Sequence, residues 1–178
     1  DCCKNPVAST GFKEEPSKSL EKQIEDLKID RIVTACPNCY HHMQNKYKVK
    51  IISIFKWLDE YEYIKDIKNP CNVFFPCSDR YNKEIFTIIK KHAPKCNDKF
   101  VDTNCCGAGG LASKKEKEIA ENMTDSIKNE EIYTYCATCS MRFSKYNKVH
   151  HFASVFLGID EEVKTDYFKN ALKAKFYK

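Results

Sequence analysis

The chain has 178 residues, of which 42% are hydrophobic and 31% charged, so it holds enough apolar residues for a core and is not a disordered chain. Its formal net charge is only +5 and the two signs are mixed along the sequence, which disfavours nucleic-acid binding. No apolar run approaches the roughly 18 residues of a membrane-spanning helix and no secretory signal opens the sequence, so we expect a cytoplasmic protein without a transmembrane segment.

Eleven cysteines are the unusual feature of the composition. Without a secretory signal, they favour a metal or redox site over a disulfide scaffold. Together with the many Lys, Asn, Ile and Tyr residues, they are typical of a cytoplasmic protein from an anaerobic bacterium. The sequence begins at Asp1 without a methionine and runs at once into Cys2 and Cys3, which indicates a cut edge rather than a natural N-terminus.

The first elements expected along the chain are a helix and a strand. Residues 17–28 are predicted to form an amphipathic helix, because three apolar residues recur with helical spacing: Leu20, Ile24 and Leu27. Residues 31–35 contain a β-branched run and are predicted to form a strand. This strand leads directly into a Cys-x-x-Cys motif formed by Cys36 and Cys39.

The middle of the chain is expected to continue the alternation of strands and helices. Residues 72–75 are predicted to form a buried strand, which a proline ends just before Cys77. A helix over residues 85–89 and a strand over residues 99–102 follow. The strand over residues 99–102 leads into the glycine-rich loop of residues 104–110.

One strand and two helices are expected in the rest of the chain. Residues 131–135 are predicted to form a strand that leads into the second Cys-x-x-Cys motif. A helix that starts near Ser113 is predicted to turn three apolar residues inward: Ile119, Met123 and Ile127. A C-terminal helix around residues 161–175 is predicted to turn four residues inward: Val163, Tyr167, Ala171 and Leu172.

The two halves of the chain share one pattern, which indicates a duplication. Residues 27–39 align with residues 127–139 without a gap, at an offset of 100. The identical pairs in this alignment are Lys28 and Lys128, Ile32 and Ile132, Thr34 and Thr134, Cys36 and Cys136, and Cys39 and Cys139. Upstream, the pair Cys2-Cys3 corresponds to Cys105-Cys106. We therefore predict two cysteine-rich repeats, an N-terminally incomplete one over residues 1–68 and a second over residues 69–178.

Strands that alternate with helices predict an α/β fold, with two similar lobes whose short, mostly parallel sheets are flanked by helices. In such sheets, ligands bind beyond the carboxyl ends of the strands. Four cysteines follow predicted strands, namely Cys36, Cys77, Cys105 and Cys136. We therefore expect the cysteines to converge at one edge, with one cluster of thiols in each lobe.

The spacing of the cysteines favours a site for soft metal ions. A Cys-x-x-Cys turn points two thiolates at one metal, and thiolate-only sites select zinc or iron–sulfur clusters. Adjacent cysteines have diverging side chains, so they suit a cluster touched at separate metals better than a single tetrahedral ion. Gly107, Gly109 and Gly110 let the backbone beside Cys105 and Cys106 approach a cofactor and donate N–H groups to its sulfurs.

Simpler interpretations of the same residues stay open at this point. Zinc bound in one or both halves would give a structural module, whereas the flanking sequence disfavours a thioredoxin-like dithiol. The paired histidines are expected to have packing or surface roles: His41, His42, His150 and His151. Cys71 and Cys96 lie outside the repeat pattern and are expected to be ordinary small buried or surface residues.

The motifs resemble the cysteine-rich, or CCG, domain of heterodisulfide reductase catalytic subunits. Relatives of that family include iron–sulfur subunits of anaerobic glycerol-3-phosphate dehydrogenase, glycolate oxidase and lactate-utilisation enzymes. The family pattern is a cysteine, then Cys-Cys-Gly, then Cys-x-x-Cys, usually twice. One copy is complete here, with Cys77, Cys105, Cys106, Gly107, Cys136 and Cys139. The other copy is matched by Cys2, Cys3, Cys36 and Cys39, with Lys4 in place of the glycine and without the leading cysteine.

The resemblance implies a [4Fe–4S] cluster of the non-cubane type, held by the five cysteines of the second repeat. For the four cysteines of the first repeat, it implies either a second cluster or Zn²⁺. It also implies electron transfer or disulfide reduction as part of an oxidoreductase. The given sequence has no ferredoxin-type cysteine run, so electron input would need either a segment missing from it or a ferredoxin-like or flavoprotein partner subunit. The alternative is a zinc-stabilised interaction domain without enzymatic activity. Iron loss is expected from Cys106→Ser but not from Cys96→Ser.

Overall fold

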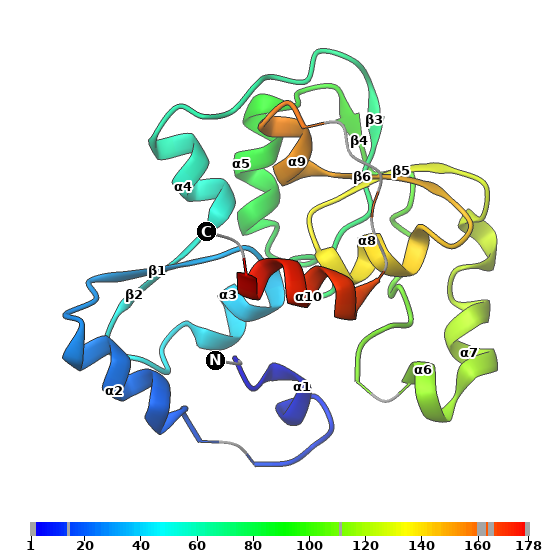
Figure 1. Ribbon diagram of the computed structural model, residues 1–178. Helices are drawn as coiled ribbons and strands as arrows, with labels where there is room; N and C mark the ends of the chain where they lie inside the picture. The colour runs from blue at the N-terminus through cyan, green and yellow to red at the C-terminus, as the bar shows by residue number, and fades with distance from the viewer. Residues whose placement is uncertain (1–2, 14, 111, 160–162, 164–165, 177–178) are drawn as a thin grey trace.

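The computed structural model describes residues 3–13, 15–110, 112–159, 163 and 166–176. In these residues, helices alternate with short parallel strand pairs, which confirms the predicted α/β class (Figure 1). Within the same residues, no helix combines the length and the apolar character needed to cross a membrane.

Both halves of the chain contain the same strand–helix–strand–helix unit. The unit of the first half consists of β1 (Arg31–Thr34), α3 (Pro37–Met43), β2 (Lys50–Ser53) and α4 (Ile54–Glu60). The unit of the second half consists of β5 (Glu131–Thr134), α8 (Ala137–Phe143), β6 (Lys148–His151) and α9 (Phe152–Phe156). The two strands of each unit are parallel, with Arg31 opposite Lys50 and Glu131 opposite Lys148. The two predicted strands before the Cys-x-x-Cys motifs are therefore confirmed.

A third parallel pair lies between the two units in sequence. It consists of β3 (Cys71–Asn72) and β4 (Cys96–Asn97), which are connected through α5 (Glu84–His92). Val73 continues β3 by bridging to Tyr133 of β5, and the Phe74 amide donates to the Tyr133 carbonyl at 2.8 Å. The middle segment is thereby attached to the second unit. The helix predicted over residues 85–89 is confirmed within α5.

The strand predicted over residues 99–102 is wrong, because these residues form a turn. The strand ends two residues earlier, at Asn97, whose side-chain oxygen accepts a hydrogen bond from the Lys99 amide at 3.1 Å. This local bond competes with continued strand pairing. The turn buries Phe100 in the core and leaves Val101 half exposed.

The helix predicted from Ser113 onward is broken into three pieces. They are α6 (Ala112–Lys115), α7 (Lys117–Asn122) and the 3-10 helix η1 (Asp125–Ile127). Ile127 is buried as expected, but Ile119 and Met123 are 54% and 41% exposed, so their predicted inward orientation is wrong. The buried residue of α7 is Ala120, which packs against the glycine-rich loop.

The two ends of the described chain are helical. The first part contains α1 (Asn5–Ala8) and α2 (Lys18–Asp26), and the Ser17 hydroxyl caps α2. The helix predicted over residues 17–28 is thus confirmed, although Leu27 is 70% exposed and does not face inward. At the other end, α10 (Tyr167–Phe176) confirms a C-terminal helix.

The inward residues predicted for the C-terminal segment have mixed outcomes. Val163 packs against a core cluster, whereas Leu172 is 57% exposed, so the prediction for Leu172 is wrong. The side chains of Tyr167 and Ala171, and residues 161–162 and 164–165, lie outside the described part of the chain.

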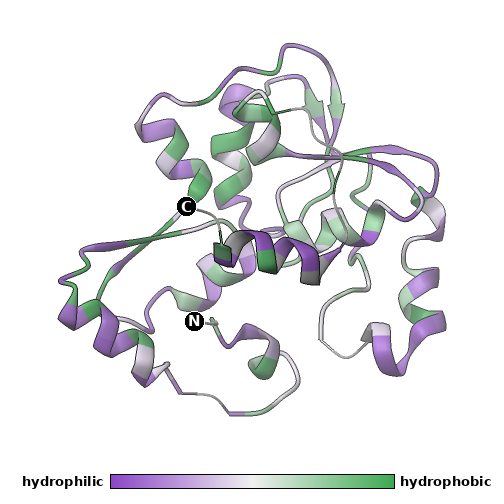
Figure 2. Ribbon diagram, viewed as in Figure 1, coloured by the Kyte–Doolittle hydropathy of each residue, from purple (hydrophilic) through white to green (hydrophobic). Residues whose placement is uncertain are grey.

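The core consists of two hydrophobic clusters. The first is rich in aromatic residues, among them Phe55, Phe75, Tyr135, Phe152 and Phe156. The second contains Phe74, Phe100 and Phe143 together with three cysteines, Cys106, Cys136 and Cys139. Figure 2 shows apolar residues concentrated around α5 and α9, while α6 and α7 are mainly hydrophilic. Cysteines of the second repeat are therefore part of the apolar core.

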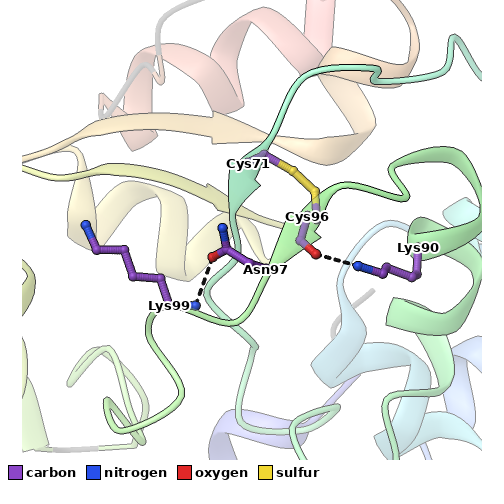
Figure 3. The surroundings of a disulfide bond; sticks show 5 residues. All are labelled: Cys71, Lys90, Cys96, Asn97 and Lys99. Atoms are coloured by element: carbon purple, nitrogen blue, oxygen red, sulfur yellow. Dashed lines mark hydrogen bonds between the residues drawn. A yellow bond between two sulfur atoms is a disulfide. The ribbon is translucent and has the colours of Figure 1, made fainter.

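Cys71 and Cys96 form a disulfide that joins β3 to β4 (Figure 3). Both residues are 3% exposed, and the strand register places them directly opposite each other. The expectation that they are small buried or surface residues agrees with their burial, but the bond between them was not expected. Parallel strand pairing brings the two cysteines into contact although they are 25 residues apart. Neither cysteine lies in a sequence motif from which this bond could be predicted.

Candidate metal centre

The first cysteine of each Cys-x-x-Cys motif lies where a strand passes into a helix. Cys36 is the N-cap residue of α3 and Cys136 is the N-cap residue of α8, and both have extended backbone conformations. Pro37 occupies the first turn of α3, where its missing N–H costs nothing. Neither cysteine side chain caps its helix, so both sulfurs are left for contacts with other groups.

The thiols of the first repeat contact one another. The sulfurs of Cys3 and Cys39 are 3.0 Å apart, and Cys39 is also hydrogen-bonded to Cys36. A cavity of about 400 Å³ opens onto these three residues. Cys2, the fourth predicted ligand of this repeat, lies outside the described residues.

The thiols of the second repeat form a similar group. The sulfurs of Cys139 and Cys106 are 3.4 Å apart, and Cys139 is also hydrogen-bonded to Cys136. Cys105 is hydrogen-bonded to its neighbour Cys106, and Cys77 lies close enough to both to act on them electrostatically. The structure thus brings together all five cysteines that were predicted for this repeat.

The two groups meet at a hydrogen bond between Cys36 and Cys136. We call the resulting set the thiol row, which comprises Cys3, Cys39, Cys36, Cys136, Cys139, Cys106, Cys105 and Cys77. The sequence predicts one cluster per lobe at a shared edge, and the structure adds that the two clusters touch. Three members are buried, namely Cys106, Cys136 and Cys139, while Cys77 is exposed.

Contacts within the thiol row decide which sulfurs favour the thiolate form. Hydrogen bonds from Cys136 and Cys105 lower the pKa values of Cys36 and Cys106, respectively. The contact with Cys106 raises the pKa of Cys139 in turn. The lowered pKa values therefore favour the thiolate, which is the form that can ligate a metal, at one cysteine of each repeat.

Gly107 holds the loop of the second repeat against α7. Its φ of 72° is in the left-handed region, and a Cβ atom at this position would overlap the carbonyl oxygen of Ala120. The same oxygen accepts a hydrogen bond from Arg142 of α8 at 3.1 Å. The Gly107 amide in turn donates to the Cys105 sulfur at 3.3 Å. One glycine therefore allows the loop and both neighbouring helices to close around the cysteines.

Asp79 is a buried acidic residue beside the thiol row that the sequence does not point to. Its carboxylate is fully buried and accepts hydrogen bonds from the Tyr135 hydroxyl at 2.8 Å and from the Ile85 and Phe86 amides at 3.1 and 3.0 Å. His41 completes the shell at 3.2 Å. Tyr135 immediately precedes Cys136, and His41 lies two residues after Cys39. Asp79 therefore connects the two Cys-x-x-Cys motifs.

Several buried polar atoms near the thiol row have no hydrogen-bond partner among the described residues. They include Ser78 Oγ beside Cys77 and Thr134 Oγ1 two residues before Cys136. The His151 ring is within electrostatic reach of Cys36, accepts from the Ala153 amide through Nδ1 and has a backbone hydrogen bond to Tyr135, while burial lowers its pKa. Buried polar groups without partners are rare, and the two hydroxyls are places for a bound water, ion or cofactor.

The remaining histidines of the predicted pairs have partners in the protein. His150 stacks on Tyr133 and contacts Glu131 at 2.8 Å, and His42 contacts Lys46 at 2.9 Å. Over the described residues, no three His, Cys, Asp or Glu side chains are arranged to hold a single metal ion.

The fold and the thiol row define a duplicated α/β protein with cysteines at the carboxyl ends of its strands. The family model described as "CCG: Cysteine-rich domain" matches residues 1–44 and 68–144, so the chain belongs to the cysteine-rich domain family.

Two curated relatives are similar over most of this chain. An uncharacterized iron–sulfur protein of Methanococcus maripaludis is 28% identical over 179 residues, which cover 84% of this chain and 35% of the relative. An uncharacterized iron–sulfur protein of Methanocaldococcus jannaschii is 26% identical over 174 residues, which cover 83% of this chain and 35% of the relative. The chain thus spans about a third of the length of these relatives. No solved structure matches it.

Proposed function

We propose that this chain binds iron–sulfur clusters through its thiol row and acts in electron transfer or disulfide reduction. The principal ligands would be Cys77, Cys105, Cys106, Cys136 and Cys139, which would hold a [4Fe–4S] cluster of the non-cubane type in the second repeat, residues 69–178. The first repeat, residues 1–68, would hold a second cluster or Zn²⁺ through Cys2, Cys3, Cys36 and Cys39.

The thiol row is the observation that carries this proposal. Eight sulfurs from five separate segments lie in one continuous set, in a chain whose other two described cysteines are bonded to each other. The five thiols of the second repeat exceed the four that a structural zinc ion uses, and thiolates are the usual ligands of iron–sulfur clusters. The buried hydroxyls of Ser78 and Thr134 fit the same group, because hydroxyl donors can bond to cluster sulfurs. The names of the two relatives agree with this choice.

A bound cluster would supply one-electron exchange, and reduction of a disulfide to two thiols consumes two electrons and two protons. The residues of the chain would provide the setting for this chemistry. Gly107 donates its N–H to Cys105, and Asp79 fixes Tyr135 and His41 beside the two Cys-x-x-Cys motifs. The contact between Cys36 and Cys136 would keep the two centres close enough for electrons to pass between the repeats. A ferredoxin-like or flavoprotein subunit would supply the electrons.

Anaerobic purification followed by metal analysis and visible spectroscopy tests the proposal. A brown protein with several iron atoms and an equal amount of acid-labile sulfide is the expected result. A colourless protein that contains only zinc would overturn the proposal and favour a zinc-stabilised interaction domain.

Variants of the second repeat locate the cluster. Cys106→Ser is expected to lose iron, because it removes a buried thiolate donor from the centre of the row. Two controls are Ser140→Ala, which changes a buried neighbour of Cys139, and Cys71→Ser/Cys96→Ser, which removes the two sulfurs outside the row. Equal iron loss from Cys106→Ser and Ser140→Ala would contradict the ligand assignment.

A further inference from the structure

Each repeat has a cavity beside the helix of its Cys-x-x-Cys motif. On its other side lies a helix that precedes the strand leading into that motif. The cavity of the first repeat lies between α2 and α3 and reaches three members of the thiol row. The cavity of the second repeat measures about 540 Å³, lies between α7 and α8, and has no cysteine among the described residues that line it. We call it the second cavity. The corresponding cavities therefore differ: the cavity of the first repeat is lined by thiols, and the second cavity is not.

The second cavity has a positive lining. Three basic side chains, Lys117, Arg142 and Lys145, face a single acidic one, Glu121. Neither Lys117 nor Lys145 has an ion-pair partner within the described residues. The cavity of the first repeat, in contrast, is lined by apolar and uncharged polar residues throughout its described wall. Positive charge at this place is thus a property of the second repeat alone.

Apolar groups complete the wall. Ala108, Ala120 and Met141 line the same space as the basic residues. A volume of about 540 Å³ is within the range of sites for small organic molecules, in which apolar walls and a few converging polar groups are combined. The lining therefore fits a ligand that has a negative group and a short apolar part.

The wall of the second cavity also contacts the thiol row. The Ala108 backbone is hydrogen-bonded to Cys106, and Arg142 holds the Ala120 carbonyl that lies under Gly107. A charge bound in the cavity would lie against Ala108, which belongs to the same loop as Cys105 and Cys106. Occupation of the cavity would therefore act on the electrostatics of these thiolates.

We propose that the second cavity binds a small organic anion that bears a carboxylate, phosphate or sulfonate group. The negative group lies against Lys117 and Lys145, and the apolar part lies against Ala108 and Met141. The proposal rests on the charges and shape of the chain itself and does not depend on the proposed cofactor.

Calorimetric titration of the anaerobically purified protein tests this site with succinate, inorganic phosphate and the diamine putrescine. We expect at least one of the two anions to bind, and putrescine not to bind. Lys117→Gln/Lys145→Gln is expected to weaken anion binding about tenfold or more. The matched control is Lys115→Gln, which removes an exposed charge two residues from Lys117 but outside the cavity lining. Arg142 is left in place because it also supports Ala120.

Three outcomes would overturn the proposal. They are the absence of binding of either anion up to about 10 mM, equal binding of putrescine, and equal weakening by Lys115→Gln and by the double variant. The first would mean that the cavity does not take anions, and the third would mean that only the general field of the lysines attracts them. Iron content, measured on the same samples, reports separately on the proposed function.

Discussion

The two repeats have the same cysteine motif in two different environments. Cys36 and Cys39 of the first repeat are partly exposed and border an open cavity, whereas Cys136 and Cys139 are 1% and 4% exposed and belong to a core cluster. The strand–helix unit around each motif is the same, so the motif itself does not decide the burial of its sulfurs. Burial depends on what covers them, which in the second repeat includes Cys106 of the glycine-rich loop and the core residues Phe74, Phe100 and Phe143.

One backbone position shows how this difference arises. Gly107 has a φ of 72° and lies directly against the Ala120 carbonyl, which leaves no room for a side chain. The corresponding Lys4 has a φ of 64°, so the first repeat keeps the same left-handed conformation with a residue that is poorly suited to it. The backbone of the Cys-Cys-Gly turn is thus conserved between the repeats, whereas the close packing against a helix is not.

The largest expected effect comes from breaking the connection between the repeats. Asp79→Ala removes the acceptor of the Tyr135 hydroxyl and of two buried amides, and leaves these donors unsatisfied. We expect a loss of about 3 kcal/mol or more in the free energy of unfolding, measured by denaturant titration under anaerobic conditions. The control Asp102→Ala changes an exposed carboxylate and should stay within about 0.5 kcal/mol of the wild type. Similar losses from both variants would show that Asp79 is not a structural connection.

Gly107→Ala tests the packing that is specific to the second repeat. The new methyl group would overlap the Ala120 carbonyl and would strain a left-handed backbone, so we expect a loss of about 2–4 kcal/mol. Gly109→Ala is the matched control, because nothing lies within 4 Å of its Cβ position. A Gly107→Ala protein as stable as the Gly109→Ala protein in denaturant titration would contradict this account of the loop.

Lys4→Gly makes the first repeat more like the second. Glycine adopts the left-handed conformation without steric cost, so we expect a gain of about 1 kcal/mol in the free energy of unfolding. Thermal unfolding of the two proteins side by side measures the difference. A loss of stability would mean that the lysine side chain makes contacts that outweigh the backbone strain.

The smallest effect is expected from ion pairs at the surface. Asp59 at the end of α4 accepts hydrogen bonds from Lys91 and His92, both at 2.8 Å, and these contacts lower the pKa of its carboxyl group. A lowered pKa means that the stabilisation is complete above about pH 4 and is lost as the pH falls further. Asp59→Asn should therefore cost up to about 1 kcal/mol, equally at pH 7 and pH 5. At about pH 3 the cost measured by thermal unfolding should be smaller than at pH 7, and an equal cost at pH 7 and about pH 3 would mean that the pKa is not lowered.

A surface acid of the second unit, Glu131 at the start of β5, provides a comparison for Asp59. It contacts Lys148 and His150 at 2.8 Å, which lowers the pKa of its carboxyl group, but its side chain is 49% exposed, against 24% for Asp59. Solvent screening should make the cost of Glu131→Gln smaller than that of Asp59→Asn.

The parts of the fold that the sequence predicts correctly are those set by local patterns. The strands before Cys36 and Cys136 follow from β-branched runs, and the duplicated unit follows from an ungapped alignment. Predictions of which helix face is buried were less successful. Ile119 and Leu27 have helical spacing but are exposed. In α7 the buried residue is Ala120 instead of Ile119, and α2 has no buried residue at all.

Contacts between segments distant in the sequence could not be predicted. Cys36 and Cys136 belong to motifs that each appear complete on their own, and only the folded chain shows that they touch. Asp79 looks like a loop residue in the sequence, yet it reaches partners 38 and 56 residues away. Cys71 and Cys96 lack any motif and meet through the register of two short strands.

The disulfide between Cys71 and Cys96 divides the sulfur of this protein into two populations with different chemical accessibility. The bonded pair lies in one core cluster, and the three buried members of the thiol row lie in the other. Alkylating reagents applied to the folded, metal-free chain should therefore modify Cys77 first, because it is exposed, and the buried thiols much more slowly. Because both cysteines of the disulfide are 3% exposed, reducing agents should cleave it slowly in the folded chain, so that β3 and β4 stay joined under mildly reducing conditions.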